Sequence, residues 1–165
     1  IVFQEMREAR GLAYSAYTYY ADGRTTDDPN YFYAFIATQN DKVHQAVEAF
    51  EDIIENMPQS QAAFDLAKQG VLANLESQRS TKMGVLWTYI NNADKGLPVN
   101  VDRNKAVYEQ VKDMTLADVV KFQQKNVKGR TYNYCILGDR NDLDMKYLQS
   151  LGKLRFVSQR EIFGY

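Results

Sequence analysis

Residues 12–20 read LAYSAYTYY, and residues 31–38 read YFYAFIAT. Both runs contain many Tyr, Phe and Thr residues and no Gly or Pro, which is typical of β-strands. The connecting residues 21–30, ADGRTTDDPN, contain Gly23, Pro29 and three Asp, a composition that favours a loop. The sequence therefore predicts an antiparallel hairpin with a long polar connection.

Most of the remaining chain shows helical periodicity. Apolar residues recur every three or four positions from Val43 to Met57, where Asn40 or Asp41 can cap the helix and Pro58 follows its end. Further helices are expected from the start to about Arg10, over Gln61–Gln78 after the cap Ser60, through Met83–Ile90, over Asn104–Val111, over Leu116–Asn126 after the cap Thr115, and over Asp142–Leu151. Residues 131–137 (TYNYCIL) are expected to form a third strand, and residues 154–157 a short last one.

This order of elements predicts an α+β fold, with one mainly antiparallel sheet and helices packed on one of its faces. The length of 165 residues fits a single domain with its own core. Val2, Phe3 and Met6 already share one helical stripe at the very start, so the chain is expected to be a truncated piece of a longer protein.

Charge and hydropathy exclude several classes of partner. The 20 Lys and Arg nearly balance the 21 Asp and Glu, giving a formal net charge of −1. That balance offers no electrostatic basis for binding nucleic acid or an anionic membrane. No apolar run is long enough to span a bilayer. We therefore expect neither a nucleic-acid partner nor a membrane span.

The chain lacks the residues of a self-contained zinc site. His44 is the only histidine and stands four residues before Glu48, on the polar side of its predicted helix. A solvated His–Glu helix pair is the favoured interpretation over a metal ligand, and neither H-x-x-E-H nor H-E-x-x-H occurs. Cys135, the only cysteine, stands among apolar residues of a predicted strand and is expected to fill the core.

Tyrosines are unusually frequent in the predicted hairpin. Six of the twelve Tyr fall there. One interpretation is structural: rings pack across the strands of a half-buried sheet while their hydroxyls reach water. The other is functional: the rings and hydroxyls form a groove for an extended peptide.

Residues 6–15 (MREARGLAYS) join a helix end with two Arg to the first strand through Gly11. If the glycine turn folds the strand against the helix, Arg7 and Tyr14 converge on one surface. A purely structural interpretation is also open, since Arg7 and Arg10 suit a helix C-terminus and Gly11 can cap it.

The stretch from Phe3 to Tyr17, FQEMREARGLAYSAY, resembles a signature of the pitrilysin/insulysin/mitochondrial-processing-peptidase superfamily of zinc metallopeptidases, or inverzincins. It is similar to the C-terminal, non-zinc member of their paired homologous domains. Residues 75–77 (LES), 136–139 (ILGD) and 151–152 (LG) agree with the family in their order. The strands that usually precede the first helix in that family are missing from this sequence.

The resemblance implies a C-terminal domain of a zinc metalloendopeptidase, a protease whose other domain holds the zinc. This half would bind the substrate backbone and close the chamber, and would not be catalytic alone. Arg7 would hydrogen-bond a substrate carbonyl, and Tyr14 would help to bind or polarise the carbonyl under attack. The implied partners are a zinc-bearing homologous domain or subunit and an extended peptide substrate.

Two alternatives stay open from the sequence. One is an inactive partner or structural subunit of the same superfamily. The other is an unrelated peptide-binding module with a Tyr-rich sheet.

Overall fold

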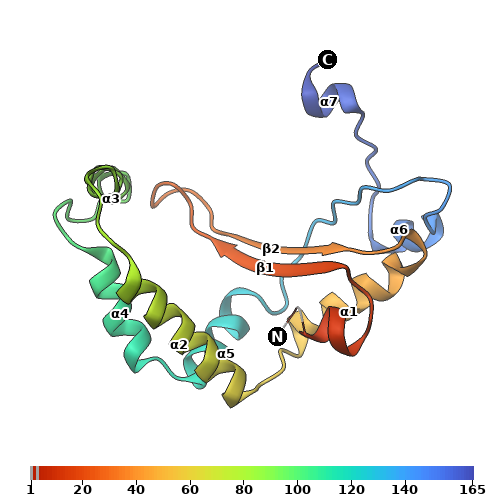
Figure 1. The fold of residues 1–165 in the computed structure, drawn as a ribbon. Coiled ribbons are helices and arrows are strands. Elements are labelled where there is room, and N and C mark those ends of the chain that lie inside the picture. The colour runs from red at the N-terminus through yellow and green to blue at the C-terminus, as the bar shows by residue number, and fades with distance from the viewer. Residues whose placement is uncertain (1, 3) are drawn as a thin grey trace.

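The computed structural model describes residues 2 and 4–165, and it has the α+β architecture that the sequence predicts. A two-stranded antiparallel sheet lies at the centre, and helices lie beneath it and beyond its ends (Figure 1). The elements in chain order are η1 (Gln4–Ala9), β1 (Ser15–Ala21), β2 (Tyr31–Ala37), η2 (Asn40–Lys42), α1 (Val43–Glu55), α2 (Gln61–Ser77), α3 (Lys82–Asp94), α4 (Arg103–Asp113), α5 (Leu116–Asn126), α6 (Met145–Leu151) and α7 (Gln159–Phe163).

The predicted hairpin is confirmed. β1 and β2 pair in the register that sets Ser15 opposite Ala37 and Ala21 opposite Tyr31. Within the connecting loop, the Gly23 N–H donates to the Asn30 side chain at 3.0 Å. Two ion pairs join this loop to the end of α3, Arg24 with Asp94 at 3.2 Å and Lys95 with Asp22 at 3.1 Å. The tip of the hairpin is thus held by side chains about seventy residues away in the sequence.

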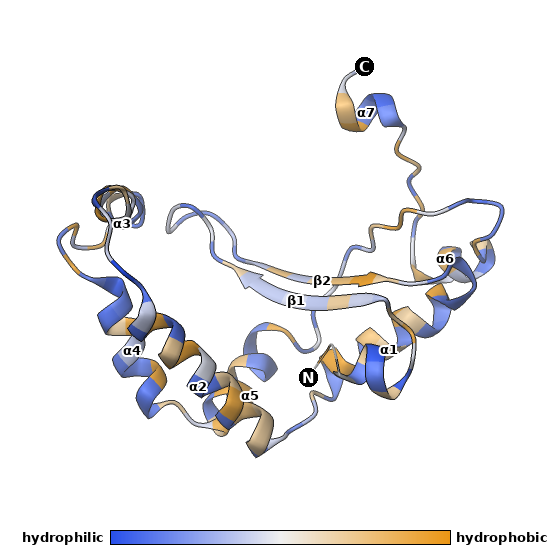
Figure 2. Cartoon of the chain, viewed as in Figure 1, coloured by the Kyte–Doolittle hydropathy of each residue, from blue (hydrophilic) through white to orange (hydrophobic). Residues whose placement is uncertain are grey.

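The core lies where one face of the hairpin meets η1 and α1. Its buried members are Met6, Leu12, Ala16, Ala49, Phe50 and Ile53. The strongly amphipathic pattern of α1 therefore serves to cover this face. The second half of β2 is the most hydrophobic part of the hairpin, and Ile36 there packs against the same cluster (Figure 2). Helices α1, α2 and α5 lie on one side of the hairpin (Figure 1).

The helix predictions hold with two corrections. Ser60 and Thr115 cap α2 and α5 through hydrogen bonds to Ala63 N and Asp118 N, as predicted. Neither Asn40 nor Asp41 caps α1, because residues 40–42 form a short 3-10 turn that leads directly into it. The helix expected at the start is a wider π-helix over Gln4–Ala9, and residues 1 and 3 of that prediction lie outside the described residues.

The predicted third strand, residues 131–137, is wrong as a strand. The segment contacts β2 through the rings of Tyr132 and Phe32, whose centroids are 6.1 Å apart, but it pairs with neither strand. The hydroxyls of its two tyrosines form hydrogen bonds to other parts of the chain. Tyr134 Oη donates to Glu51 Oε1 of α1 at 2.5 Å, and Tyr132 Oη donates to Val127 O at 2.5 Å. Burial and the bond to Glu51 raise the pKa of Tyr134 to about 12. Residues 154–157 form no strand either.

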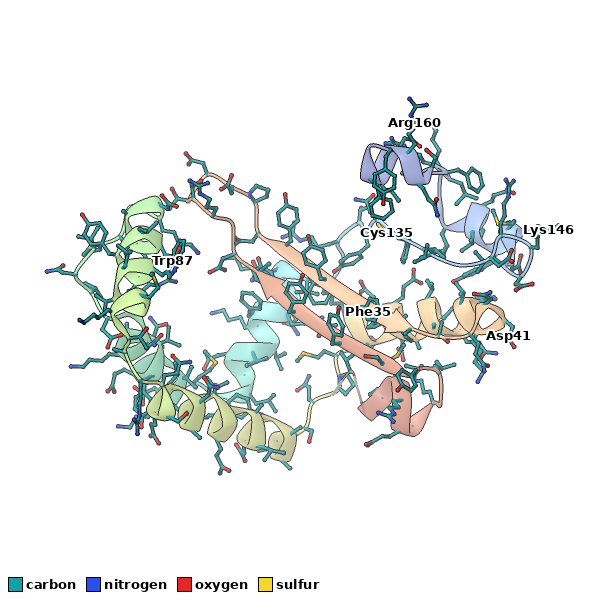
Figure 3. The ribbon with its side chains drawn as sticks, turned by 45° about the horizontal axis from the view of Figure 1, so that its top comes forward. Phe35, Asp41, Trp87, Cys135, Lys146 and Arg160 are labelled. Atoms are coloured by element: carbon teal, nitrogen blue, oxygen red, sulfur yellow. The ribbon has the colours of Figure 1, made fainter. Side chains whose placement is uncertain are left out.

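Cys135, expected in the core, is exposed on this unpaired segment. Figure 3 shows it beside the hairpin rather than beneath it, where the core lies. Tyr132 and Tyr134 of this segment contact Phe32 of β2 and Glu51 of α1, whereas the side chain of the neighbouring Cys135 is exposed. The apolar pattern that predicted a buried strand therefore does not lead to burial here.

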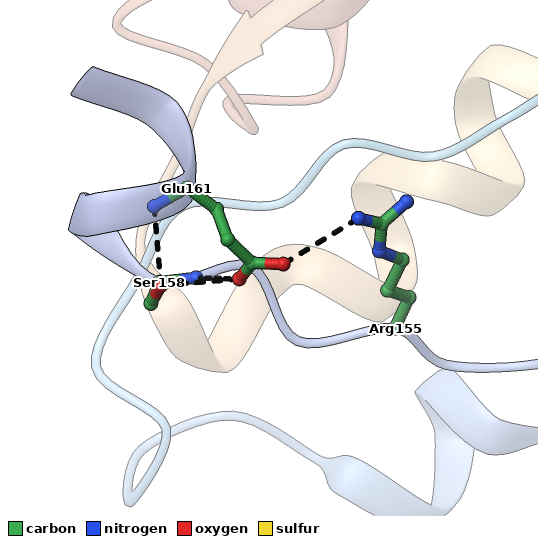
Figure 4. Close-up of polar contacts among 3 residues, drawn as sticks. All are labelled: Arg155, Ser158 and Glu161. Carbon is green, nitrogen blue, oxygen red and sulfur yellow. Dashed lines mark hydrogen bonds and ion pairs between the residues drawn. The ribbon is translucent and has the colours of Figure 1, made fainter. Parts of the chain in front are cut away.

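Capping boxes begin both α5 and α7. In α7, the Glu161 carboxylate accepts from the Ser158 N–H at 2.8 Å and the Ser158 hydroxyl at 3.1 Å, and Arg155 Nη2 lies 3.5 Å away (Figure 4). In α5, Asp118 accepts from the Thr115 hydroxyl at 2.6 Å and the Thr115 N–H at 2.9 Å. Both sets of bonds favour the ionised carboxylate and lower the pKa of Glu161 and of Asp118.

We expect the Asp118 box to make stability sensitive to acid. The folded-state pKa of Asp118 is below the ordinary value of 3.8, so the unfolded chain takes up a proton more readily than the folded chain does. The stabilisation is present above the unfolded pKa and is lost as the pH falls through the folded pKa. Urea midpoints compared between about pH 6 and about pH 3 should fall less in Asp118→Asn than in the wild-type chain.

Asp113→Asn at the end of α4 is the control for this prediction. Within the described part of the chain, the Asp113 carboxylate takes part in no hydrogen bond or ion pair. Its variant should follow the wild-type acid dependence. Equal acid sensitivity in Asp118→Asn and the wild-type chain would contradict the role given to the capping box.

Candidate functional site

A sharp corner at Gly11 places the end of η1 against the start of β1. Gly11 has a φ of +59°, a conformation that side-chain-bearing residues rarely adopt. Next to it, the Leu12 N–H donates to Met6 O at 2.9 Å. The chain therefore reverses within a few residues, and η1 and β1 lie in contact.

Arg7 and Tyr14 lie on the two arms of this corner. Arg7 is an exposed residue of η1. Tyr14 stands just before β1, where its backbone N–H donates to Ala37 O at 2.9 Å. Its side chain is 84% exposed, so the hairpin holds the backbone while the phenol faces solvent. The fold thus puts both predicted residues on neighbouring elements with their side chains accessible.

Two tertiary contacts fix the corner on the rest of the fold. Arg10 Nη2 forms an ion pair with Asp52 Oδ2 of α1 at 2.9 Å. Hydrogen bonds from Asn56 and from Arg10 lower the pKa of Asp52. On the strand side, the Thr38 hydroxyl donates to Leu12 O at 2.6 Å. Arg10, which directly follows η1, therefore serves to anchor this corner on α1.

The hairpin face away from the core carries a ladder of stacked rings, here called the aromatic face: Tyr17, Tyr19, Tyr31, Tyr33 and Phe35. Cross-strand ring centroids are 4.9 Å apart in both the Tyr17–Phe35 and the Tyr19–Tyr33 pairs. Each ring stays 45–51% exposed. This confirms the cross-strand packing that the sequence predicts, and it also leaves an open surface of rings and hydroxyls.

The predicted helix pair of His44 is confirmed. His44 Nε2 lies 3.0 Å from Glu48 Oε1 on the exposed side of α1. Its ring also stacks on Tyr147 of α6, with centroids 3.7 Å apart. Among residues 2 and 4–165, no group of three His, Cys, Asp or Glu side chains is placed to hold a metal ion. The described residues therefore do not form a zinc site.

None of the helices in the described part of the chain is long and apolar enough to cross a membrane.

Comparison with known proteins gives one match. Residues 1–71 match the model of a family described as the Peptidase M16 inactive domain. The match contains the Gly11 corner, the whole hairpin, α1 and the first part of α2. It confirms the resemblance to the C-terminal, non-zinc domain. No curated protein and no solved structure matches the chain.

Proposed function

We propose, from the match of residues 1–71 to the Peptidase M16 inactive domain family, that this chain is the non-zinc half of a zinc metalloendopeptidase. Its role is to bind the backbone of a peptide substrate and to close the chamber in which a homologous, zinc-bearing domain cuts it. The substrates are peptides or unfolded segments in extended form, because a chamber between two domains excludes folded proteins.

The observation that carries this proposal is the Gly11 corner. It presents a guanidinium and a phenol from adjoining elements, with both side chains accessible. Arg7 offers several N–H donors in a fixed plane, which suits a peptide carbonyl. The Tyr14 hydroxyl is a neutral donor that can bind a carbonyl oxygen as negative charge develops on it. In this proposal, Arg7 and Tyr14 bind carbonyl groups of the same extended substrate backbone.

The aromatic face supports an extended ligand next to this corner. Tyr rings contribute a large contact area at a low cost in conformational entropy, and their hydroxyls bind backbone groups. A two-stranded sheet also has unpaired backbone groups along its outer edges, which an extended peptide can use. Contacts of this kind depend little on the side chains of the peptide, so they can hold peptides of many different sequences.

The exposed area supports the need for a partner domain. The chain exposes 12816 Å². A compact monomer of 19.0 kDa exposes roughly 8,400 Å². The excess is larger than the surface buried in a standard interface, about 1,600 Å². A large face of this chain is therefore suited to packing against another domain.

The catalytic metal has no place in the described residues, so the proposal assigns none to this chain. Zinc would be bound by the partner domain and would supply the hydrolytic chemistry there. In the proposal, this chain's own residues have roles separate from that chemistry: Arg7 and Tyr14 orient the substrate carbonyl, and the domain helps to close a chamber that folded proteins cannot enter.

An inactive partner or structural subunit of the same superfamily is the second candidate, because the matched family is described as an inactive domain. Both candidates bind a zinc-bearing partner. They differ in whether this chain adds to the rate of hydrolysis. The unrelated peptide-binding module is not supported, since the family match includes the hairpin on which that idea rested.

A complementation assay tests the proposal. A zinc-bearing homologous domain from the same source is purified separately, mixed with this chain and given an unstructured fluorogenic peptide. We expect little hydrolysis by either half alone, a large gain on mixing and loss of that gain with a chelator. A stable complex without any gain in rate would instead assign this chain to the inactive partners.

A further inference from the structure

A large apolar cavity lies between the underside of the hairpin and the helices beneath it. Its volume is about 580 Å³. Residues of the hairpin and of α1, α2, α4 and α5 line it. Figure 1 shows α1, α2 and α5 beneath the hairpin. Representative lining residues are Tyr20, Phe32, Phe50, Ile54, Phe64 and Val119.

The cavity is open to solvent along one side, and some of its apolar lining residues are exposed, among them Val71 at 44% and Phe122 at 47%. Exposed apolar surface of this kind often marks a binding site. Pockets for small molecules have volumes of about 300–1,000 Å³ and mostly apolar walls. The cavity therefore has the size and the lining of a ligand site, and it is too apolar to hold a cluster of ordered water.

Two of the polar groups in the walls are already engaged within the protein. The Ser60 hydroxyl accepts from Ala63 N at 3.2 Å as the cap of α2. The Gln123 amide donates to Ile54 O. These groups cannot serve an interior ligand without giving up bonds that hold α2 and α5. Apart from Lys68 and the hydroxyl-bearing Thr18, Tyr19 and Tyr20 of the hairpin, most of the lining is apolar, which favours a ligand with an aliphatic chain.

Lys68 gives the cavity a single charge. It is the only charged residue among the described lining residues, and it is half-buried. Its Nζ donates to Met114 O at 2.9 Å and lies 5.9 Å from the Phe64 ring centroid. None of the ion pairs formed by the described residues involves Lys68. An ammonium at the rim of an apolar cavity complements a ligand with one anionic head and an apolar tail.

We propose that this cavity binds one molecule of a free long-chain fatty acid. The aliphatic chain fills the space under the hairpin, and the carboxylate pairs with Lys68 Nζ at the rim. The site is separate from the Gly11 corner and does not depend on the peptidase role. The charge of Lys68 favours a fatty acid over a neutral lipid, and the apolar walls favour it over a small polar anion.

Calorimetric titration of the 165-residue chain with monomeric palmitate tests this. We expect saturable binding of about one palmitate per chain. Lys68→Met keeps the aliphatic stem and removes the charge, and it should weaken palmitate binding about tenfold while leaving cetyl alcohol binding unchanged. Lys105→Met on α4, which does not line the cavity, is the matched control and should bind as the wild type does.

A second variant tests the location. Ala63→Phe places a ring in the cavity from α2 and should abolish palmitate binding. Circular dichroism shows whether this variant is folded. If it is not, Val119→Phe fills the same space from α5. No saturable binding, undiminished binding in the filled variant, or equal palmitate affinity in Lys68→Met and Lys105→Met would each overturn the proposal. Retention on phosphatidylglycerol vesicles in place of palmitate binding would also overturn it.

Discussion

Tyr14→Phe is expected to lower kcat/KM for peptide hydrolysis by the assembled two-domain enzyme by roughly 10²–10³-fold. The variant removes one hydroxyl and keeps the ring, so it deletes a donor aimed at the carbonyl under attack. Such a donor acts mainly in the transition state, because that is where charge develops on the oxygen. The fall should therefore appear in kcat rather than in KM.

Two measurements make the Tyr14 result specific. The zinc content of the assembled enzyme should stay unchanged, because the metal belongs to the partner. Tyr165→Phe is the matched control, since Tyr165 is 87% exposed and lies at the far end of the chain. Equal kcat/KM in wild type, Tyr14→Phe and Tyr165→Phe would remove Tyr14 from the reaction.

Arg7→Ala is also expected to lower kcat/KM, but through a change in both kcat and KM. A guanidinium bound to a substrate carbonyl is present in the ground state as well as in the transition state, so KM should rise while kcat falls. Arg79→Ala, at an exposed arginine between α2 and α3, is the matched control and should leave both kcat and KM unchanged.

Met6→Ala should destabilise the chain by about 2–5 kcal/mol. Met6 of η1 is 0% exposed and packs against residues of the hairpin and of α1. Its truncation therefore leaves a cavity where these three elements meet. Met83→Ala on α3 makes the same chemical change at a residue that is 60% exposed, and it should cost far less. Urea unfolding of the two variants is the measurement. Equal losses of unfolding free energy in Met6→Ala and Met83→Ala would contradict the place of Met6 in the core.

The sequence is sufficient to predict the elements whose signals are local. The hairpin follows from two Tyr-rich runs separated by a Gly- and Asp-containing loop, and α2 and α5 begin after the caps Ser60 and Thr115. The Gly11 corner is predictable too, because a left-handed turn after a helix favours glycine. These features depend on residues only a few positions apart.

Features that depend on distant residues could not be predicted in this way. The ion pair of Arg10 with Asp52 joins residues 42 positions apart, and nothing in either neighbourhood marks it. Residues 131–137 have a strand-like sequence, yet Tyr132 and Tyr134 bond to Val127 and Glu51 and leave the backbone unpaired. The cavity beside Lys68 is a property of several helices together, and no single pattern reveals it.

The central claim is that the Gly11 corner contacts the substrate next to the bond that is cut. Photo-crosslinking tests it most directly: benzoylphenylalanine replaces Tyr14 in the assembled enzyme, a slowly cleaved peptide is bound, and the cross-linked peptide residue is identified by mass spectrometry. We predict cross-links to the residues that flank the cleaved bond, and none from the same probe at Tyr165. Absence of peptide cross-links from position 14, or equal cross-linking from both positions, would contradict the claim.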